Sequence, residues 1–175
     1  MRRIFAGLGI VLGLVLMASP VHSGGTKEEK ITQDKLPKKV LEAVKSWFAE
    51  PKFTALTKET TGDKVVYDLE FTFKGKKYEM DVKEDGTVLE IEKEVASKDL
   101  PAAVAKAVKD KFPKATVKEA MEVNLVDGKK LTLDHYEIII ETDGKSMEIT
   151  VTPDGKKVGG GEKKAEKKIE SKDKN

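Results

Sequence analysis

The sequence contains no cysteine, and only two of its 175 residues are histidines. Without cysteine the chain cannot form disulfides, thiolate metal sites or a cysteine nucleophile. Its two arginines, Arg2 and Arg3, stand at the start, so every basic residue after them is a lysine. Because arginine makes the bidentate contacts to guanine and phosphate, this shortage argues against nucleic-acid binding.

Side chains suited to catalysis are also few. Apart from His22, the only histidine is His135, which is typical of a surface or half-buried strand residue. No serine stands in a nucleophile-elbow setting, and the glycines at 159–161 precede no helix with a phosphate-binding lysine. The sequence therefore predicts that the protein is not an enzyme and has neither catalytic nor metal-ligating residues.

The first 23 residues are typical of a secretory signal peptide. Two arginines precede an apolar run from Ile4 to Met17, and small residues follow up to Ser23. The run is shorter than the roughly 20 apolar residues that a membrane-spanning helix needs. We therefore expect cleavage after Ser23 and a protein that is periplasmic or secreted, with no membrane span in the mature chain. An uncleaved anchor is the alternative.

Removing residues 1–23 changes the charge balance. It leaves 31 lysines against 31 acidic residues, so the mature chain has no formal net charge. Residues 156–175 hold eight of these lysines and only four acids, which makes the remainder acidic. We expect residues 159–175 to be a disordered Lys/Glu-rich tail. Electrostatic attachment of this tail to an anionic surface is the alternative.

The body of the sequence reads as one unit written twice. Leu36-Pro37 opens a segment that recurs 64 residues later at Leu100-Pro101, and Asp85-Gly86 recurs 69 residues later as Asp154-Gly155. Internal repeats of this kind indicate duplicated structural units. The expected organisation is a signal peptide (1–23), a polar leader (24–34), a first repeat (35–95), a second repeat (96–158) and the tail (159–175).

Each repeat begins with a helical pattern and continues with strands. Pro37 and Pro101 suit the first position of a helix, and the following apolar residues recur every three or four positions. After Pro51 and Pro113 the apolar residues alternate, and Asp-Gly pairs mark hairpin turns. The pattern predicts an α+β fold of two tandem repeats, each one helix packed on a four-stranded antiparallel sheet.

The turn and core motifs resemble a known family. Leu-Pro at the helix start, Phe112-Pro-Lys-Ala115 at its end, and Asp-Gly between alternating strands are similar to the PepSY-like domain of bacterial exported proteins, in its β-lactamase-inhibitor-like subgroup. The resemblance covers about residues 35–158 in two copies. It implies a small exported protein without catalytic residues that binds another protein, such as a peptidase. The hairpin at 74–77 has no acidic or aromatic tip, so β-lactamase is not the indicated target.

An acidic face is the main candidate site. If Val65 and every second residue up to Phe73 face the helix, the other face of the first sheet presents six acids: Asp68, Glu70, Glu79, Asp81, Glu90 and Glu92. Like charges on neighbouring strands destabilise a sheet, so something should offset them. Lysines such as Lys64 and Lys83, a basic partner or the lysine tail, and a calcium ion are the three alternatives. No Asp-x-Asp-x-Asp-Gly loop is present.

Ile139 is the other candidate binding residue. It lies between Glu137 and Glu141 on the face of the second sheet that the helix should leave uncovered. Its position predicts contact with the other repeat, with a second copy or with a protein partner. Together these residues favour an exported, non-catalytic protein-binding module that inhibits or regulates a peptidase or another envelope enzyme. The alternatives are a calcium- or cation-responsive binding protein and an envelope structural protein; no cofactor other than calcium is expected.

Overall fold

The computed structural model describes residues 26–163. The expected signal peptide and most of the expected tail lie outside these residues. The elements are β1 (Lys27–Lys30), α1 (Lys38–Trp47), β2 (Lys52–Thr61), β3 (Lys64–Phe73), β4 (Lys76–Lys83), β5 (Val88–Glu94), α2 (Ala102–Lys111), β6 (Thr116–Asp127), β7 (Lys130–Thr142), β8 (Lys145–Val151) and β9 (Val158–Lys163). Short 3₁₀ turns, Gln33–Lys35 and Ser97–Asp99, precede the two helices.

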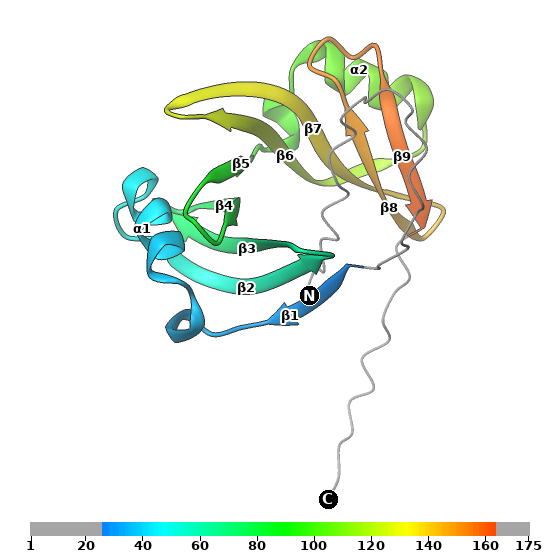
Figure 1. The fold of residues 1–175 in the computed structure, drawn as a ribbon. Coiled ribbons are helices and arrows are strands. Elements are labelled where there is room, and N and C mark those ends of the chain that lie inside the picture. The colour runs from blue at the N-terminus through cyan, green and yellow to red at the C-terminus, as the bar shows by residue number, and fades with distance from the viewer. Residues whose placement is uncertain (1–25, 164–175) are drawn as a thin grey trace, which may run out of the picture.

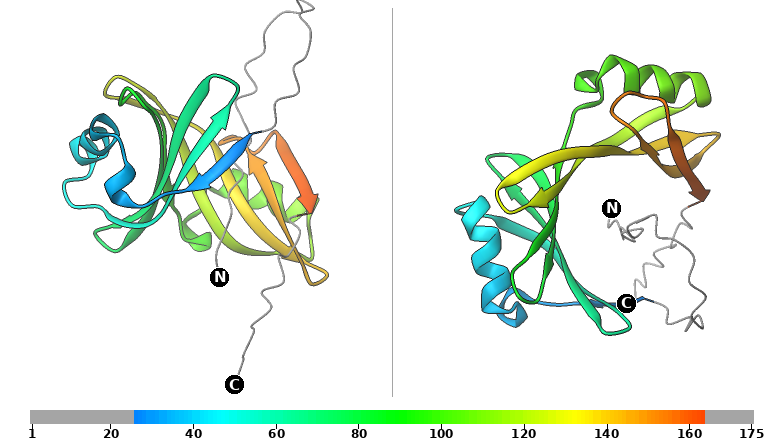
Figure 2. Two further views of the ribbon diagram at one scale, coloured as in Figure 1. Left: turned by 60° about the horizontal axis from the view of Figure 1, so that its bottom comes forward. Right: turned by 45° about the horizontal axis from the view of Figure 1, so that its top comes forward.

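The nine strands form one antiparallel sheet in the order of the sequence, from β1 to β9. The sheet is strongly curved, and both helices lie on its convex side (Figure 1). Two further views show the same arrangement, with the concave side of the sheet free of helices (Figure 2). The described part of the chain is therefore mainly β, with two short helices on one face.

The prediction of an α+β fold of two tandem repeats, each one helix packed on a four-stranded antiparallel sheet, was wrong. β5 pairs with β6 in antiparallel register from Glu90 opposite Leu125 to Glu94 opposite Met121, which joins the two halves into one sheet. Two further strands also lie at the ends: β1 comes from the expected leader, and β9 extends into the expected tail. The physical reason is that unpaired strand edges carry free backbone N–H and C=O groups, which pairing satisfies.

Each helix covers its own apolar core on the convex side. Val40 and Val44 of α1 are fully buried against Leu69, Phe71 and other residues of β2 to β5. Val104 and Val108 of α2 pack on a second cluster, built from β6, β7 and β8. Pro37 and Pro101 have extended backbone and lie at the N-cap positions, one residue before the first helical position that the sequence pattern predicted. Neither core includes the carboxyl groups of the concave face, which also carries the buried apolar residues Met121 and Val123.

The β6–β7 hairpin reaches from the second half of the chain to the first helix. Val126, near its tip, packs against the core beneath α1. Lys129 Nζ lies 4.9 Å from the centre of the Trp47 ring, within range of a cation–π contact. The long hairpin therefore holds the two halves together in addition to the β5–β6 pairing.

Candidate binding surface on the concave face

The strand register places the six predicted acids in two rows across the concave face. In the first row Asp68 lies opposite Asp81, which lies opposite Glu90. In the second row Glu70 lies opposite Glu79, which lies opposite Glu92. Directly opposite side chains in an antiparallel pair are about 5 Å apart at Cβ, so each row sets three carboxyl groups side by side.

The same face continues across the second half of the sheet. Glu92 lies opposite Val123, which lies opposite His135. Ile139, on β7, lies opposite Glu119 on β6 and opposite Glu148 on β8. All seven residues predicted to bind a partner therefore lie on one face. We call this surface the acidic face: Glu59, Asp68, Glu70, Lys77, Glu79, Asp81, Glu90, Glu92, Glu119, Met121, Val123, His135, Glu137, Ile139 and Glu148.

A lysine neutralises the second row. Lys77 Nζ lies 2.8 Å from Glu79 Oε1, 3.1 Å from Glu119 Oε1 and 3.9 Å from Glu70 Oε2. Glu79 is only 4% exposed, so its charge would be costly without this partner. Burial still raises the pKa of Glu79, against the opposing effect of Lys77. Lys77 thus acts as an internal cation that also links β4 to β6.

The first row is balanced by protons instead of lysines. Burial, reinforced by the charges of Asp81 and Glu79, raises the pKa of Asp68 to about 9. Burial and the charge of Glu90 raise the pKa of Asp81 to about 7. Neither Lys64 nor Lys83 forms an ion pair with this row within residues 26–163. At neutral pH, Asp68 is therefore protonated and Asp81 is close to half-protonated.

Glu90 and Glu92 lie on β5, the fifth of the nine strands, and neighbouring carboxylates repel their charges. Burial and the charge of Glu137 raise the pKa of both, that of Glu92 well above its ordinary value. Glu92 Oε2 is buried and has no hydrogen-bond partner among the described residues. A buried carboxyl oxygen without a donor costs free energy, so this end of the second row gains from any cation that reaches it.

His135 is a side chain on this face that can gain a positive charge. Its Nδ1 lies 2.8 Å from Asp134 Oδ2, and its Nε2 lies 3.4 Å from Glu137 Oε1. Burial disfavours the charged ring, but the hydrogen bonds with Glu137 and Asp134 outweigh it and raise the pKa of His135. Its partial burial agrees with the expected half-buried strand position.

The sequence predicted the six acids of the first half and placed Glu137 and Glu141 beside Ile139 on the uncovered face of the second. It did not indicate Glu119 or Glu148, which join the face because β6, β7 and β8 continue the same sheet. It also did not single out Lys77, which lies on the face through its place on β4. Two bulges shift the alternation: Lys118 is the extra residue on β6, and Asp134 is the extra residue on β7. A period-two pattern read through these bulges assigns residues to the wrong face.

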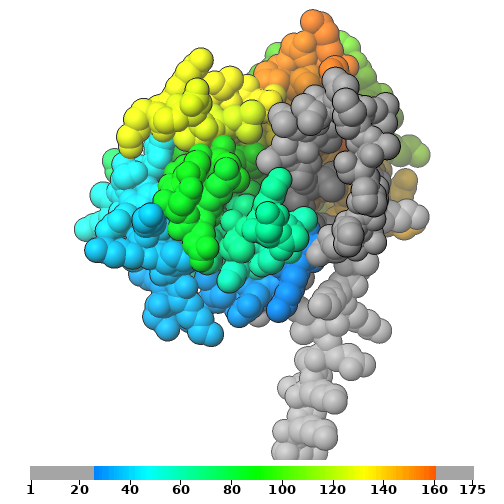
Figure 3. Space-filling model, in the orientation of Figure 1, coloured from blue at the N-terminus to red at the C-terminus, as the bar shows by residue number. Residues whose placement is uncertain are grey.

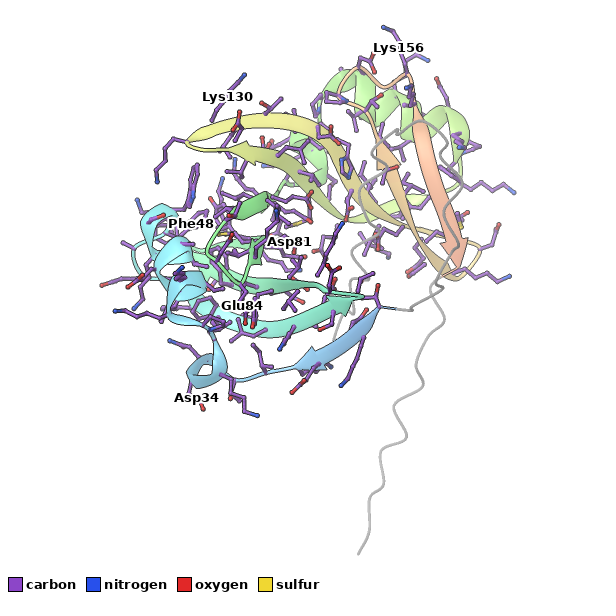
Figure 4. The ribbon with its side chains drawn as sticks, in the orientation of Figure 1. Asp34, Phe48, Asp81, Glu84, Lys130 and Lys156 are labelled. Carbon is purple, nitrogen blue, oxygen red and sulfur yellow. The ribbon has the colours of Figure 1, made fainter. Side chains whose placement is uncertain are left out.

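The acidic face does not have the geometry of a metal centre in the described part of the chain. No group of three or more histidine, aspartate or glutamate side chains there is arranged to hold an ion. Rows of carboxyls on straight strands cannot wrap one cation as a calcium loop does. Calcium binding stays a prediction. Figure 4 shows Asp81 on the inner side of the sheet, with Phe48 at the end of α1 on the other side.

A family model matches most of the chain. It is described as "Putative beta-lactamase-inhibitor-like, PepSY-like" and matches residues 24–89 and 66–157. The chain belongs to this PepSY-like family. The resemblance noted from the turn and core motifs is thereby confirmed. No curated protein matches the chain in sequence.

Solved structures with a similar fold come from Bacteroides species. A BLIP-like protein of Bacteroides fragilis is 17% identical, with a TM-score of 0.51 over 72% of this chain and 84% of its own. A protein of Bacteroides eggerthii, titled a putative periplasmic protein, is 16% identical, with a TM-score of 0.55 over 71% and 88%. A DUF2874 family protein of Bacteroides uniformis is 13% identical, with a TM-score of 0.55 over 73% and 88%. Because the sequence identities are low, these similarities show only that the PepSY-like chain shares the fold of these proteins.

Within residues 26–163 no helix is both long and apolar enough to cross a membrane. The two α-helices each have ten residues and carry lysines on their exposed sides.

Proposed function

We propose that this PepSY-like protein is an exported, non-catalytic binding module that works in the periplasm or outside the cell. Its acidic face binds a lysine- or arginine-rich surface of a protein partner, such as a peptidase or another envelope enzyme that it inhibits or regulates. The family description and the BLIP-like and periplasmic titles of proteins with this fold support an export and binding role.

The first acidic row is the observation that carries the proposal. Asp68, Asp81 and Glu90 lie side by side on a face without helices, and no lysine of the described chain neutralises them. In the free protein, protons reduce their repulsion. A cationic partner would replace the protons, because ammonium and guanidinium groups stabilise ionised carboxylates. Basic partners therefore gain an attraction that neutral or acidic partners lack.

The partner is to be captured from envelope and secreted fractions of the source organism and identified by mass spectrometry. Three baits are compared: the natural protein, the triple variant Asp68→Asn/Asp81→Asn/Glu90→Gln, and a control triple variant. The control, Glu42→Gln/Glu50→Gln/Asp110→Asn, removes the same number of carboxyl groups from exposed positions outside the sheet.

The expected result is one basic protein retained by the natural and control baits and lost from the first-row variant. If that protein is a peptidase or hydrolase, its activity should fall when the natural protein is added. Equal retention by all three baits, or no retained protein, would contradict the proposal. Running each capture with calcium and with a chelator separates a calcium-dependent partner from a calcium-independent one.

A further inference from the structure

The first third of β7 is a strand edge without a neighbour. β7 pairs with β8 only from Tyr136 to Thr142, whereas its pairing with β6 continues to Lys130 at the hairpin tip. Residues 130–134 are all exposed, and no other described strand lies along their outer side. An open strand edge is a template for adding another strand.

This edge also carries exposed apolar side chains. Leu131 is 45% exposed and Leu133 is 37% exposed, and with Leu125 they are the exposed large hydrophobic residues of the described chain. Leu131 lies opposite Val126 and Leu133 opposite Asn124, so both leucines lie on the same face of the hairpin. In the space-filling view the hairpin stands out from the body as a yellow rim (Figure 3).

We propose that a second copy of this chain pairs with the edge, β7 against β7, around a two-fold axis at Thr132. The segment reads Lys130-Leu131-Thr132-Leu133-Asp134, so antiparallel pairing with itself sets Lys130 opposite Asp134 of the second copy at both ends. It also sets Leu131 opposite Leu133 twice, and Thr132 opposite itself. Every pair is favourable: two ion pairs, two apolar pairs and one threonine pair.

The backbone alternation fits the same register. Asp127 and Lys130 flank the two-residue turn as a directly opposed pair, and in such hairpins this pair is hydrogen-bonded. The N–H and C=O groups of Lys130 and Thr132 then point toward β6, and those of Leu131 and Leu133 point to the free edge. Leu131 opposite Leu133 is therefore a hydrogen-bonded pair in the dimer, which gives four backbone hydrogen bonds across the axis.

Two features of the structure leave room for this contact. Lys130 stands at the end of the hairpin and points away from the rest of the molecule (Figure 4). Asp134 bonds His135 Nδ1 through Oδ2 at 2.8 Å, and its carboxylate keeps Oδ1 for a second donor. The contact is small compared with a stable dimer interface, so we expect a reversible dimer with a Kd between about 10 μM and 1 mM.

Charge reversal tests the register directly. Lys130→Asp alone sets two acids opposite each other at both ends, and Asp134→Lys alone does the same with two lysines. Each single variant should raise the Kd of the dimer at least about tenfold. The double variant Lys130→Asp/Asp134→Lys restores both ion pairs and should dimerise like the natural chain. An equimolar mixture of the two single variants should form a heterodimer.

The measurement is sedimentation equilibrium of the full exported chain from about 10 μM to 1 mM. Lys145→Asp, at the β7–β8 hairpin, is the control for the change in charge, and circular dichroism confirms that each variant is folded. Dimers of the natural chain, the control and the double variant, with monomers of the single variants, support the proposal. A natural chain that stays monomeric throughout, or single variants that dimerise unchanged, would overturn it.

Discussion

Asp68 shows how a side chain of the acidic face adapts to its place. It lies opposite Asp81, with Glu70 two residues away on its own strand, and burial adds to the repulsion from these neighbours. The folded protein therefore binds a proton at Asp68 that the unfolded chain releases at its ordinary pKa near 3.9. Such a group stabilises the fold fully below that pKa, and the stabilisation is lost as the pH rises toward 9. His135, with a raised pKa, shifts stability in the same direction.

The protein should therefore melt at a higher temperature at pH 5.5 than at pH 8.5. Asp68→Asn replaces the titrating carboxyl group with an amide of the same shape. It should raise the Tm at pH 8.5 by a few degrees, which corresponds to about 1 kcal/mol in the free energy of unfolding. It should also make the Tm less dependent on pH. Calorimetry at both pH values measures this, with Asp63→Asn in the exposed β2–β3 turn as the control. A Tm that rises with pH would contradict the assignment.

Lys77 has the opposite role, since it allows Glu79 to keep its charge. Lys77→Met removes the ammonium that contacts Glu79 and Glu119 and should lower the free energy of unfolding by about 2–3 kcal/mol, because a buried carboxylate loses its partner. Lys93→Met is the matched control, since Lys93 forms a more exposed pair with Glu122 at 3.1 Å; we expect about 1 kcal/mol or less. Urea unfolding measures the free energy of unfolding of both variants. Equal losses would contradict the role of Lys77 as the partner of a buried carboxylate.

At the scale of single elements, two of the Asp-Gly turns, at Gly86 and Gly155, pack closely against the helices. Gly86 and Gly155 have φ angles of +89° and +69°. A Cβ at Gly86 would lie 3.0 Å from the Lys39 carbonyl oxygen of α1, and one at Gly155 would lie 2.4 Å from that of Ala103 of α2. These glycines are therefore required both for their backbone conformation and for close packing against a helix.

The matched pair Gly155→Ala and Gly128→Ala separates these two requirements. Both glycines have similar positive φ angles, but a Cβ at Gly128 would meet no atom within 4 Å. Gly128→Ala should cost about 1 kcal/mol from backbone strain alone. Gly155→Ala should cost about 3 kcal/mol or more, because α2 must move. Urea unfolding measures the free energy of unfolding of both variants. If the two losses differ by less than about 0.5 kcal/mol, the usual error of additivity, then Gly155 is not required for close packing against α2.

The helices and the hairpin turns could be predicted from the sequence, because each depends on residues close together in the chain. Val40 and Val44 recur at helical spacing, and Asp85-Gly86 and Asp127-Gly128 mark turns, because these signals are local. The pairing of β5 with β6 could not be predicted, since it depends on which of two open edges meet in space. The acidic face was predicted mainly where the alternation is regular. The bulges in β6 and β7 and the contact of Lys77 with Glu119 depend on the tertiary structure.

At the scale of the whole molecule, the continuous sheet turns two small acidic surfaces into one. The β5–β6 pairing brings Glu92 beside Val123 and His135, and Lys77 beside Glu119. Both described helices lie on the convex side, so neither covers the concave face (Figure 2). The proposed partner must therefore supply positive charge to this surface, which binds protons when no partner is present.

Binding of a cationic partner to the acidic face can be measured by isothermal titration with a defined dodecalysine peptide at pH 7. Titrations in two buffers with different ionisation enthalpies report how many protons are exchanged on binding. We expect binding that weakens with salt and releases protons to the buffer, as lysines replace the protons of Asp68 and Asp81. We also expect the variant Asp68→Asn/Asp81→Asn to lose that proton release. Binding without proton release, or no binding at low salt, would show that the acidic face does not exchange protons for cations.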